Sequence, residues 1–218
     1  MAFPEDFKGD ELVFKVATYV ESFMSKFDAS HDWHHILRVV SLSRAIFNIS
    51  SPKSDNGKIS CLRKIILAAL LHDVADSKYL RPDEDGSRIV ADLLVNYGTD
   101  EKLASDIQAI CHGVSYRAEV NDPAKAQALL EEHPELAVVQ DADRLDAIGA
   151  IGIGRCFTYG GAKTSRSLDA SVHHFDEKLF HLEAMMKTPA GREMAKERTE
   201  RLRVFKQWWD DESNMTTS

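Results

Sequence analysis

The sequence predicts an all-helical protein that forms a single domain. Apolar residues recur at spacings of three and four along most of the chain, which is typical of amphipathic helices. No segment alternates apolar and polar residues for long enough to predict a strand. No internal repeat and no linker between two cores interrupts the 218 residues, of which 44% are hydrophobic. One helical domain over residues 1–218 is therefore the simplest interpretation.

The N-terminal third of the chain contains three predicted helices. They span about residues 11–27, 32–49 and 59–74. Asp10 is a suitable N-cap for the first helix, because its carboxylate can accept a hydrogen bond from a free amide of the first turn. The third helix is apolar around nearly its whole circumference, so we expect it at the centre of the protein.

The rest of the chain contains six more predicted helices. They span about residues 89–97, 103–112, 123–133, 134–151, 169–187 and 189–211. Pro123 suits the first turn of its helix. Three glycines between residues 149 and 154 lower helix propensity but allow close approach of another helix. We expect loops at residues 78–86, 116–122 and 159–166.

The overall charge argues against binding to a nucleic-acid polymer. The chain has 35 acidic and 27 basic residues, a net charge of -8, whereas such binding usually requires a basic face. A small anionic substrate remains compatible, because a divalent cation can supply positive charge locally. The three cysteines contain no CxxC pair, which makes a disulfide framework or a zinc knuckle improbable.

The N-terminal segment predicts no signal peptide, because it lacks a basic flank followed by an apolar run. The longest apolar run, residues 65–71, is far too short to cross a bilayer. We therefore expect no membrane partner and a cytoplasmic location, with the nucleus as the alternative.

A His-Asp pair directly follows this apolar run. His72 and Asp73 come immediately after Leu71. Burial of an unpaired carboxylate is costly, so Asp73 requires a cation or strong hydrogen-bond donors, and a divalent metal is such a cation. Asp76 would lie on the same face if the helix continued that far. The alternative is that His72 simply ends the helix, where a histidine is favourable.

A second candidate group lies at the start of the helix predicted from residue 32. His35 and Arg38 are three residues apart and share a face, while His34 points about 100° away. A lone histidine in a helix is usually structural or solvated. A histidine beside an arginine on one face of an apolar helix indicates a site for an anion and a metal.

The third group consists of three acids in the sequence DADRLD. Asp141, Asp143 and Asp146 are surrounded by apolar residues. Arg144 could form an ion pair with one of them, which is the structural alternative. Three acids against one base leave negative charge that a metal ion would neutralise.

The order of these groups resembles the HD-domain phosphohydrolases. The resemblance is carried by HxxRV at residues 35–39, LLHD at residues 70–73 and DADRLD at residues 141–146. The longer phrases SHDWHHILRV and QDADRLDAIGAIGIGR resemble small stand-alone members from bacteria and fungi, which include nucleotide pyrophosphohydrolases. The resemblance covers nearly the whole chain. It implies an HD-type helical bundle with a metal-site core at about residues 31–147 and C-terminal helices, about residues 169–211, packed on it.

The resemblance also implies the ligands of one divalent metal ion. They are His35, His72, Asp73 and one acid of the third group, most naturally Asp143. Asp141 is the second choice, and otherwise we expect it to support the ligands from behind. Mixed nitrogen and oxygen ligands favour Mn²⁺, Fe²⁺ or Co²⁺ over Mg²⁺, and Mn²⁺ is the preferred expectation.

Further residues receive expected roles around this ion. Asp76 is expected to orient or deprotonate the attacking water, with pairing to Lys78 or Arg81 as the alternative. Arg38 and Lys78 are expected to bind phosphate. Three more residues are expected to bind substrate: His112, Lys178 and Arg198. The alternative for His112 is a buried core histidine, and the alternative for Lys178 and Arg198 is a surface ion pair. His31 and Asp32 are expected to cap the helix and to support His35.

The expected activity is hydrolysis of a nucleotide, with release of pyrophosphate or phosphate by a metal-activated water. A nucleoside 5'-monophosphatase and an alarmone hydrolase are the enzymatic alternatives. A helical module that binds metal or nucleotide without turnover is the non-enzymatic one. The expected partner is a small anionic nucleotide, and a second copy of the chain in a homodimer is compatible with the sequence.

Overall fold

A computed structural model describes residues 9–50, 58–74 and 85–215, and every regular element in these ranges is helical. The all-α prediction is therefore confirmed. The helices are α1 (Glu11–Met24), α2 (Trp33–Ser50), α3 (Lys58–Leu71), α4 (Ile89–Asn96), α5 (Glu101–Gly113), α6 (Tyr116–Asn121), α7 (Pro123–Glu132), α8 (Glu135–Asp146), α9 (Gly149–Tyr159), α10 (Leu168–Glu177) and α11 (Pro189–Met215). Within the described ranges, no helix is both long enough and apolar enough to cross a membrane.

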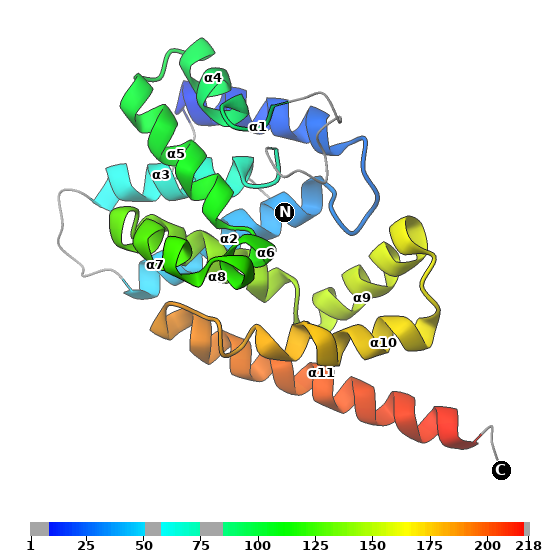
Figure 1. Cartoon of the computed structure of the whole chain (residues 1–218). Helices are drawn as coiled ribbons and strands as arrows, with labels where there is room; N and C mark the ends of the chain where they lie inside the picture. The colour runs from blue at the N-terminus through cyan, green and yellow to red at the C-terminus, as the bar shows by residue number, and fades with distance from the viewer. Residues whose placement is uncertain (1–8, 51–57, 75–84, 216–218) are drawn as a thin grey trace.

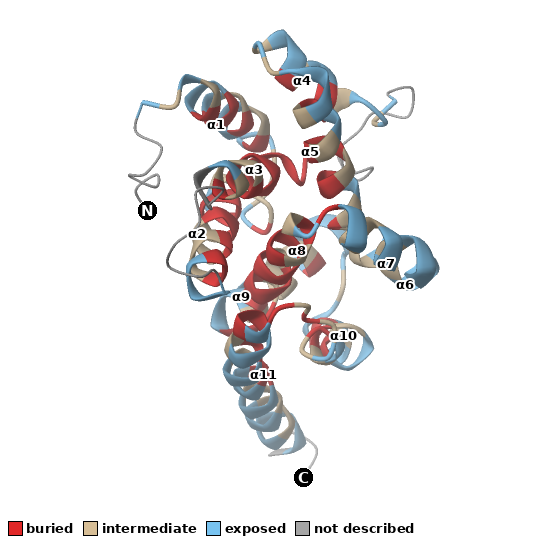
Figure 2. Cartoon of the chain, turned by 90° about the vertical axis from the view of Figure 1, so that its left-hand side faces the viewer, coloured by how far each residue is buried: buried red, intermediate tan, exposed pale blue. Residues whose placement is uncertain are grey.

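Helix α3 lies at the centre of the bundle, as predicted. It packs against α1, α2, α5 and α8, which surround it in Figure 1. The run from Leu67 to Leu71 has no exposed surface, and Figure 2 shows buried residues on the faces that α3 and α8 turn inward. The second half of α3 is covered on several sides, which explains its continuous apolar sequence, whereas Arg63 and Lys64 lie in the less buried first half.

The C-terminal helices pack on the end of the bundle formed by α2 and α8. Helix α11 contacts α8, α2 and α9, and its outer half extends beyond the other helices (Figure 1). An aromatic cluster joins α9 to α11. The Phe157 ring lies 5.9 Å from the Phe205 ring and 5.8 Å from the Trp209 ring, measured between centroids. This cluster holds α9 against α11.

The helix predicted over residues 134–151 is in fact two helices. Helix α8 ends at Asp146 and α9 begins at Gly149, whose φ is +74°. That backbone conformation is strained for a residue with a side chain, so the glycine permits a sharp change of direction that the apolar periodicity does not reveal. The prediction of one continuous helix was wrong for this reason.

Other boundaries also differ from the predictions. Residues 116–121, predicted as loop, form α6, and Ser115 Oγ accepts a hydrogen bond from the Ala118 amide at its start. The helix predicted over residues 169–187 ends at Glu177 and is followed by a 3-10 turn. The predicted loop at residues 159–166 contains a π-helical turn. Helix α3 ends at Leu71, so His72 and Asp73 lie in a turn and not in a helix.

Replacement of the glycine between α8 and α9 tests the importance of this change of direction. Gly149→Ala should destabilise the protein by about 1–3 kcal/mol, because φ is positive and a Cβ atom would lie 3.1 Å from Arg198 Cγ. A melting temperature lowered by roughly 2–4 °C per kcal/mol is expected in calorimetry. Gly154→Ala is the control, since its Cβ would enter open space. Equal melting temperatures for the two variants would contradict the prediction.

Candidate metal centre

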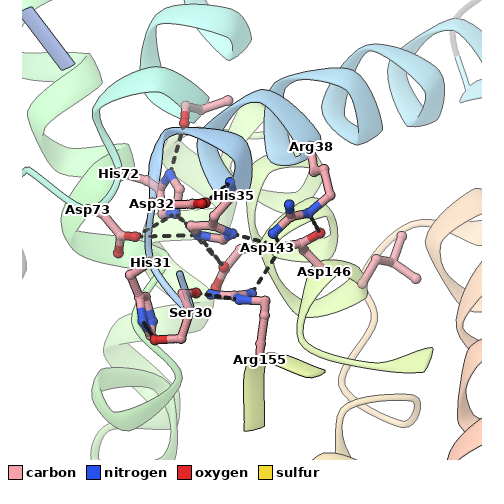
Figure 3. Close-up of polar contacts among 12 residues, drawn as sticks. Ser30, His31, Asp32, His35, Arg38, His72, Asp73, Asp143, Asp146 and Arg155 are labelled. Carbon is pink, nitrogen blue, oxygen red and sulfur yellow. Dashed lines mark hydrogen bonds and ion pairs between the residues drawn. The ribbon is translucent and has the colours of Figure 1, made fainter. Parts of the chain in front are cut away.

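The candidate metal centre lies where α2, α8, α9 and the turn after α3 meet (Figure 3). Helix α2 contributes His35 from its first turn, and the turn after α3 contributes His72 and Asp73. Helix α8 contributes Asp143. Among the described residues, His35, His72 and Asp73 each offer a ligand atom within 4.8 Å of the others, and all three are buried. The predicted group from the first and second motifs therefore assembles in space.

The ring of His35 is held in one orientation. Asp32 caps α2 through a hydrogen bond from the His35 amide to Asp32 Oδ1, 3.0 Å long, as expected for this residue. The His35 side chain is fully buried, and its Nδ1 lies 2.8 Å from Asp146 Oδ2. A carboxylate only accepts hydrogen bonds, so Nδ1 carries the proton and Nε2 presents a lone pair to the centre.

The ring of His72 is also held in one orientation. Its Nδ1 donates to the Ala69 carbonyl at 2.8 Å, so its Nε2 also presents a lone pair. The two Nε2 atoms are 3.3 Å apart. Two nitrogen lone pairs that face each other in a buried site repel, and a cation that accepts both removes the conflict. The arrangement of the two rings therefore suits a metal ion, which makes this group a candidate metal site.

Two carboxylates complete the set of donor atoms. Asp73 Oδ2 lies 3.4 Å from His35 Nε2 and 3.6 Å from His72 Nε2. This oxygen is buried, and no donor among the described residues forms a hydrogen bond with it. Asp143 Oδ1 lies 3.6 and 3.8 Å from the same two nitrogens, and its side chain is 30% exposed. Two nitrogens and two oxygens, with one side open, fit a divalent ion that also binds a ligand from solution.

The charges around the centre keep both acids ionised. Burial raises the pKa of Asp73, but the neighbouring His72 and His35 outweigh this effect and hold it well below its ordinary value. The same histidines lower the pKa of Asp143 against the effect of burial. Burial and Arg155 lower the pKa of His35, but its hydrogen bond with Asp146 and the negative charge of Asp73 raise it above the ordinary value. A proton on His35 therefore competes with a cation for this site.

Asp146 is the acid that supports His35. It is 1% exposed and accepts hydrogen bonds from Arg38 Nε at 2.7 Å, Arg38 Nη2 at 3.1 Å and Arg155 Nη1 at 3.1 Å. Burial raises its pKa, but these partners together with His35 hold the pKa well below its ordinary value. In the structure, Arg38 thus uses two of its donors on Asp146. Its expected role in phosphate binding stays a prediction.

Sequence reasoning grouped Asp146 with the other acids but gave it no role. The three-residue spacing between Asp143 and Asp146 was the available signal, since it places both on one side of α8. Arg155 ends the phrase QDADRLDAIGAIGIGR, which carries the family resemblance, but it received no role from the sequence. Its position in space depends on the turn at Gly149.

Asp141 lies elsewhere, and the expectation that it supports the ligands was wrong. Its Oδ1 accepts from the Lys187 amide at 2.8 Å, and its Oδ2 accepts from the amide and the hydroxyl of Thr188, both at 2.7 Å. Lys187 and Thr188 directly precede α11. Asp141 is fully buried and fastens the start of α11 to α8. It points away from the candidate centre because Asp141 and Asp143 are two residues apart on a helix, which turns their side chains about 200° from each other.

The remaining predicted residues occupy varied positions. Arg198 Nη1 donates to the Leu145 carbonyl at 2.6 Å, and Lys178 Nζ lies 4.7 Å from the centre of the Tyr116 ring. His112 is exposed, and its Nε2 lies 2.8 Å from Gln108 Nε2. Their roles in substrate binding stay predictions. Asp76 and Lys78 lie outside the described residues.

His31 lies beside His35. Its Nδ1 is 2.8 Å from Ser30 Oγ, and its ring meets the His35 ring edge-on with centroids 5.8 Å apart. The expected support of His35 by this residue is consistent with this contact and stays a prediction.

Comparison with known proteins identifies relatives. The model of the HD domain family matches residues 32–148. YpgQ of Bacillus subtilis is 36% identical over 192 residues, which are 84% of this chain and 85% of YpgQ. The crystal structure of YpgQ in complex with ADP superposes with a TM-score of 0.69 at 33% identity and covers 91% of this chain and 97% of YpgQ. An HD-superfamily hydrolase from Bacillus thuringiensis gives a TM-score of 0.67 at 32% identity and covers 94% and 98% of the two chains.

Two substitutions in α8 should separate the roles of its acids. Asp143→Asn should weaken Mn²⁺ binding by more than about tenfold, because a charged donor at the centre is lost. Asp141→Asn should leave Mn²⁺ affinity unchanged but cost about 1–3 kcal/mol of stability, since the amide would place a donor against the Thr188 donors. Titration calorimetry and thermal unfolding measure the two effects. The assignment fails if Asp141→Asn is the variant that loses the metal.

Proposed function

Since this chain belongs to the HD domain family, we propose that it is a metal-dependent phosphohydrolase that acts on a nucleotide and releases pyrophosphate or phosphate. The observation that carries the proposal is the pair of His35 and His72 Nε2 atoms, 3.3 Å apart, beside Asp73 Oδ2, which has no hydrogen-bond donor among the residues that the structure describes. A purely structural core has no reason to turn two lone pairs and a buried carboxylate oxygen toward the same point.

His35, His72, Asp73 and Asp143 are the residues that would hold the cation. When bound, a divalent ion supplies Lewis acidity, which polarises a phosphate oxygen and acidifies a water molecule. The charge of the ion would offset that of the two carboxylates. The centre would then not repel an anionic substrate, although the whole chain carries a net charge of -8. The exposed side of Asp143 gives the direction from which a substrate reaches the centre.

The polar residues around the ligands have separate tasks in this proposal. Asp146 keeps the His35 proton on Nδ1 and thereby keeps Nε2 free for the metal. Arg38 supports Asp146 with two parallel hydrogen bonds. The carbonyl of Ala69 performs for His72 the task that Asp146 performs for His35. Preorganised ligands of this kind allow binding without rearrangement of the buried side chains.

A nucleotide is the substrate class that the relatives support. YpgQ, which is similar over most of both chains, was crystallised with ADP. We therefore place the phosphates of a nucleotide at the open side of the centre. Mn²⁺ is the proposed ion, with Fe²⁺, Co²⁺ and Mg²⁺ as the others to compare, because nitrogen ligands favour the transition metals.

A nucleotide panel tests the proposed reaction. Nucleoside mono-, di- and triphosphates and a guanosine polyphosphate are incubated with each metal ion, and the products are identified by chromatography and phosphorus NMR. We expect Mn²⁺-dependent release of pyrophosphate or phosphate, with loss of activity after chelation and recovery when Mn²⁺ is added back.

A matched pair of acid variants controls this experiment. Asp73→Asn should lower kcat/KM by more than about 100-fold, since it removes a charged donor from the centre. Asp106→Asn should leave kcat/KM unchanged, because Asp106 pairs with Lys64 at the surface of α5. A folded, Mn²⁺-loaded protein that hydrolyses nothing in the panel would refute the enzymatic proposal and favour a binding module.

Mn²⁺ affinity should decrease as the pH falls. Asp146 and Asp73 hold the pKa of His35 above its ordinary value, so protons begin to compete for Nε2 at a higher pH than for a free histidine. The affinity is therefore highest above this pKa and is lost as the pH drops through it. Calorimetric titrations between about pH 8 and about pH 5, in buffers of different ionisation enthalpy, measure the affinity and the proton released. A constant Kd over this range would contradict the prediction.

A further inference from the structure

Two segments outside the family match reach the metal centre. The match covers residues 32–148, whereas the turn at residues 28–31 and helix α9 lie on either side of it. Arg155 of α9 connects the two. Its Nε donates to the Ser30 carbonyl at 2.7 Å, and its Nη1 donates to Asp146 Oδ2 at 3.1 Å (Figure 3). The side chain is only 11% exposed, so both hydrogen bonds are sheltered from water.

The guanidinium geometry makes this connection specific. Nε and Nη1 belong to one rigid plane, so the two acceptors must keep a fixed separation to be reached together. One acceptor, Asp146, in turn holds the ligand His35 through the hydrogen bond of 2.8 Å. The other acceptor is the backbone of the 28–31 turn. Arg155 therefore sets the distance between this turn and the support of a metal ligand.

The 28–31 turn forms a wall of the centre. Ser30 Oγ lies 2.8 Å from His31 Nδ1 and donates to Asp28, so the turn is internally cross-linked. The ring of His31 meets His35 edge-on, and it also meets the ring of Tyr159 with centroids 5.5 Å apart. Tyr159 follows Arg155 by four residues and shares its face of α9. Helix α9 thus contacts the 28–31 turn through two side chains, Arg155 and Tyr159.

We infer that Arg155 is a positioning residue of this centre, which holds Asp146 against His35 and fixes the 28–31 turn beside the ligands. Its effect on turnover rests on the proposed function. Its effect on metal binding and on the turn does not, and those two effects can be measured without any substrate.

Arg155→Lys tests the inference. The variant keeps the charge and the long stem, but a single ammonium group cannot occupy the positions of Nε and Nη1 together. We expect Mn²⁺ binding to weaken by at least about tenfold, as is usual when the support of a metal ligand is lost. We also expect a changed visible spectrum of bound Co²⁺ and faster hydrogen exchange at the amides of residues 28–31. In an active parent protein, kcat should fall by at least about tenfold.

Arg63→Lys is the matched control. Arg63 also donates from Nε and a terminal nitrogen to one carboxylate, that of Asp10, at 2.6 and 3.1 Å. This pair joins α3 to the start of α1 and has no contact with the ligands. The control should therefore leave Mn²⁺ affinity, the Co²⁺ spectrum and exchange at residues 28–31 unchanged.

The outcomes distinguish a failure of the inference about Arg155 from a failure of the proposed function. If the parent hydrolyses no nucleotide but Arg155→Lys weakens Mn²⁺ binding and loosens the turn, the inference holds and the proposed function fails. If Arg155→Lys changes only the melting temperature and leaves Mn²⁺ affinity, the Co²⁺ spectrum and exchange as in the parent, the inference is overturned. Should Arg155→Lys fold poorly, Arg155→Gln, which also lacks the forked donor, is measured in the same way.

Discussion

The buried hydrogen bond between His35 Nδ1 and Asp146 Oδ2 decides which nitrogen of His35 faces the metal centre. With the proton on Nε2 instead, the ring would direct a donor at His72 Nε2 and at any cation. Asp146 can serve as this acceptor only while it stays ionised in the core, and Arg38 and Arg155 provide the opposite charge that keeps it so. The orientation of one ring thus depends on side chains from α2, α8 and α9 together.

The position of Asp73 explains why the fold and the centre are linked. The acid follows an apolar stretch that is buried on several sides, and its Oδ2 has no hydrogen-bond donor among the described residues. A buried, unpartnered carboxylate oxygen destabilises a folded chain by several kcal/mol. A ligand that binds only the folded form stabilises that form by RT ln(1 + L/Kd), where L is its free concentration, so a cation here would offset this cost.

The sequence was most informative where burial and charge conflict. Asp73 after the apolar run predicted a cation or strong hydrogen-bond donors from the cost of its burial, and His35 with Arg38 on one helix face predicted a second segment of the site. The choice of Asp143 over Asp141 needed the family resemblance, because an acid-rich helix does not reveal which face turns inward. Arg155 received no role from the sequence, since its reach depends on a positive φ three residues after α8 ends. The same backbone feature hid the boundary between α8 and α9.

Helix α8 directs neighbouring side chains to different partners within six residues. Asp141 bonds to the start of α11, Arg144 pairs with Glu119 on α6, and Asp146 holds His35. Each residue of an α-helix is turned by about 100° from the one before it. One inserted or deleted residue inside this stretch would therefore rotate every later side chain away from its partner. The three contacts therefore require the present spacing between residues 141 and 146, and only segments outside it can change in length while the centre is kept.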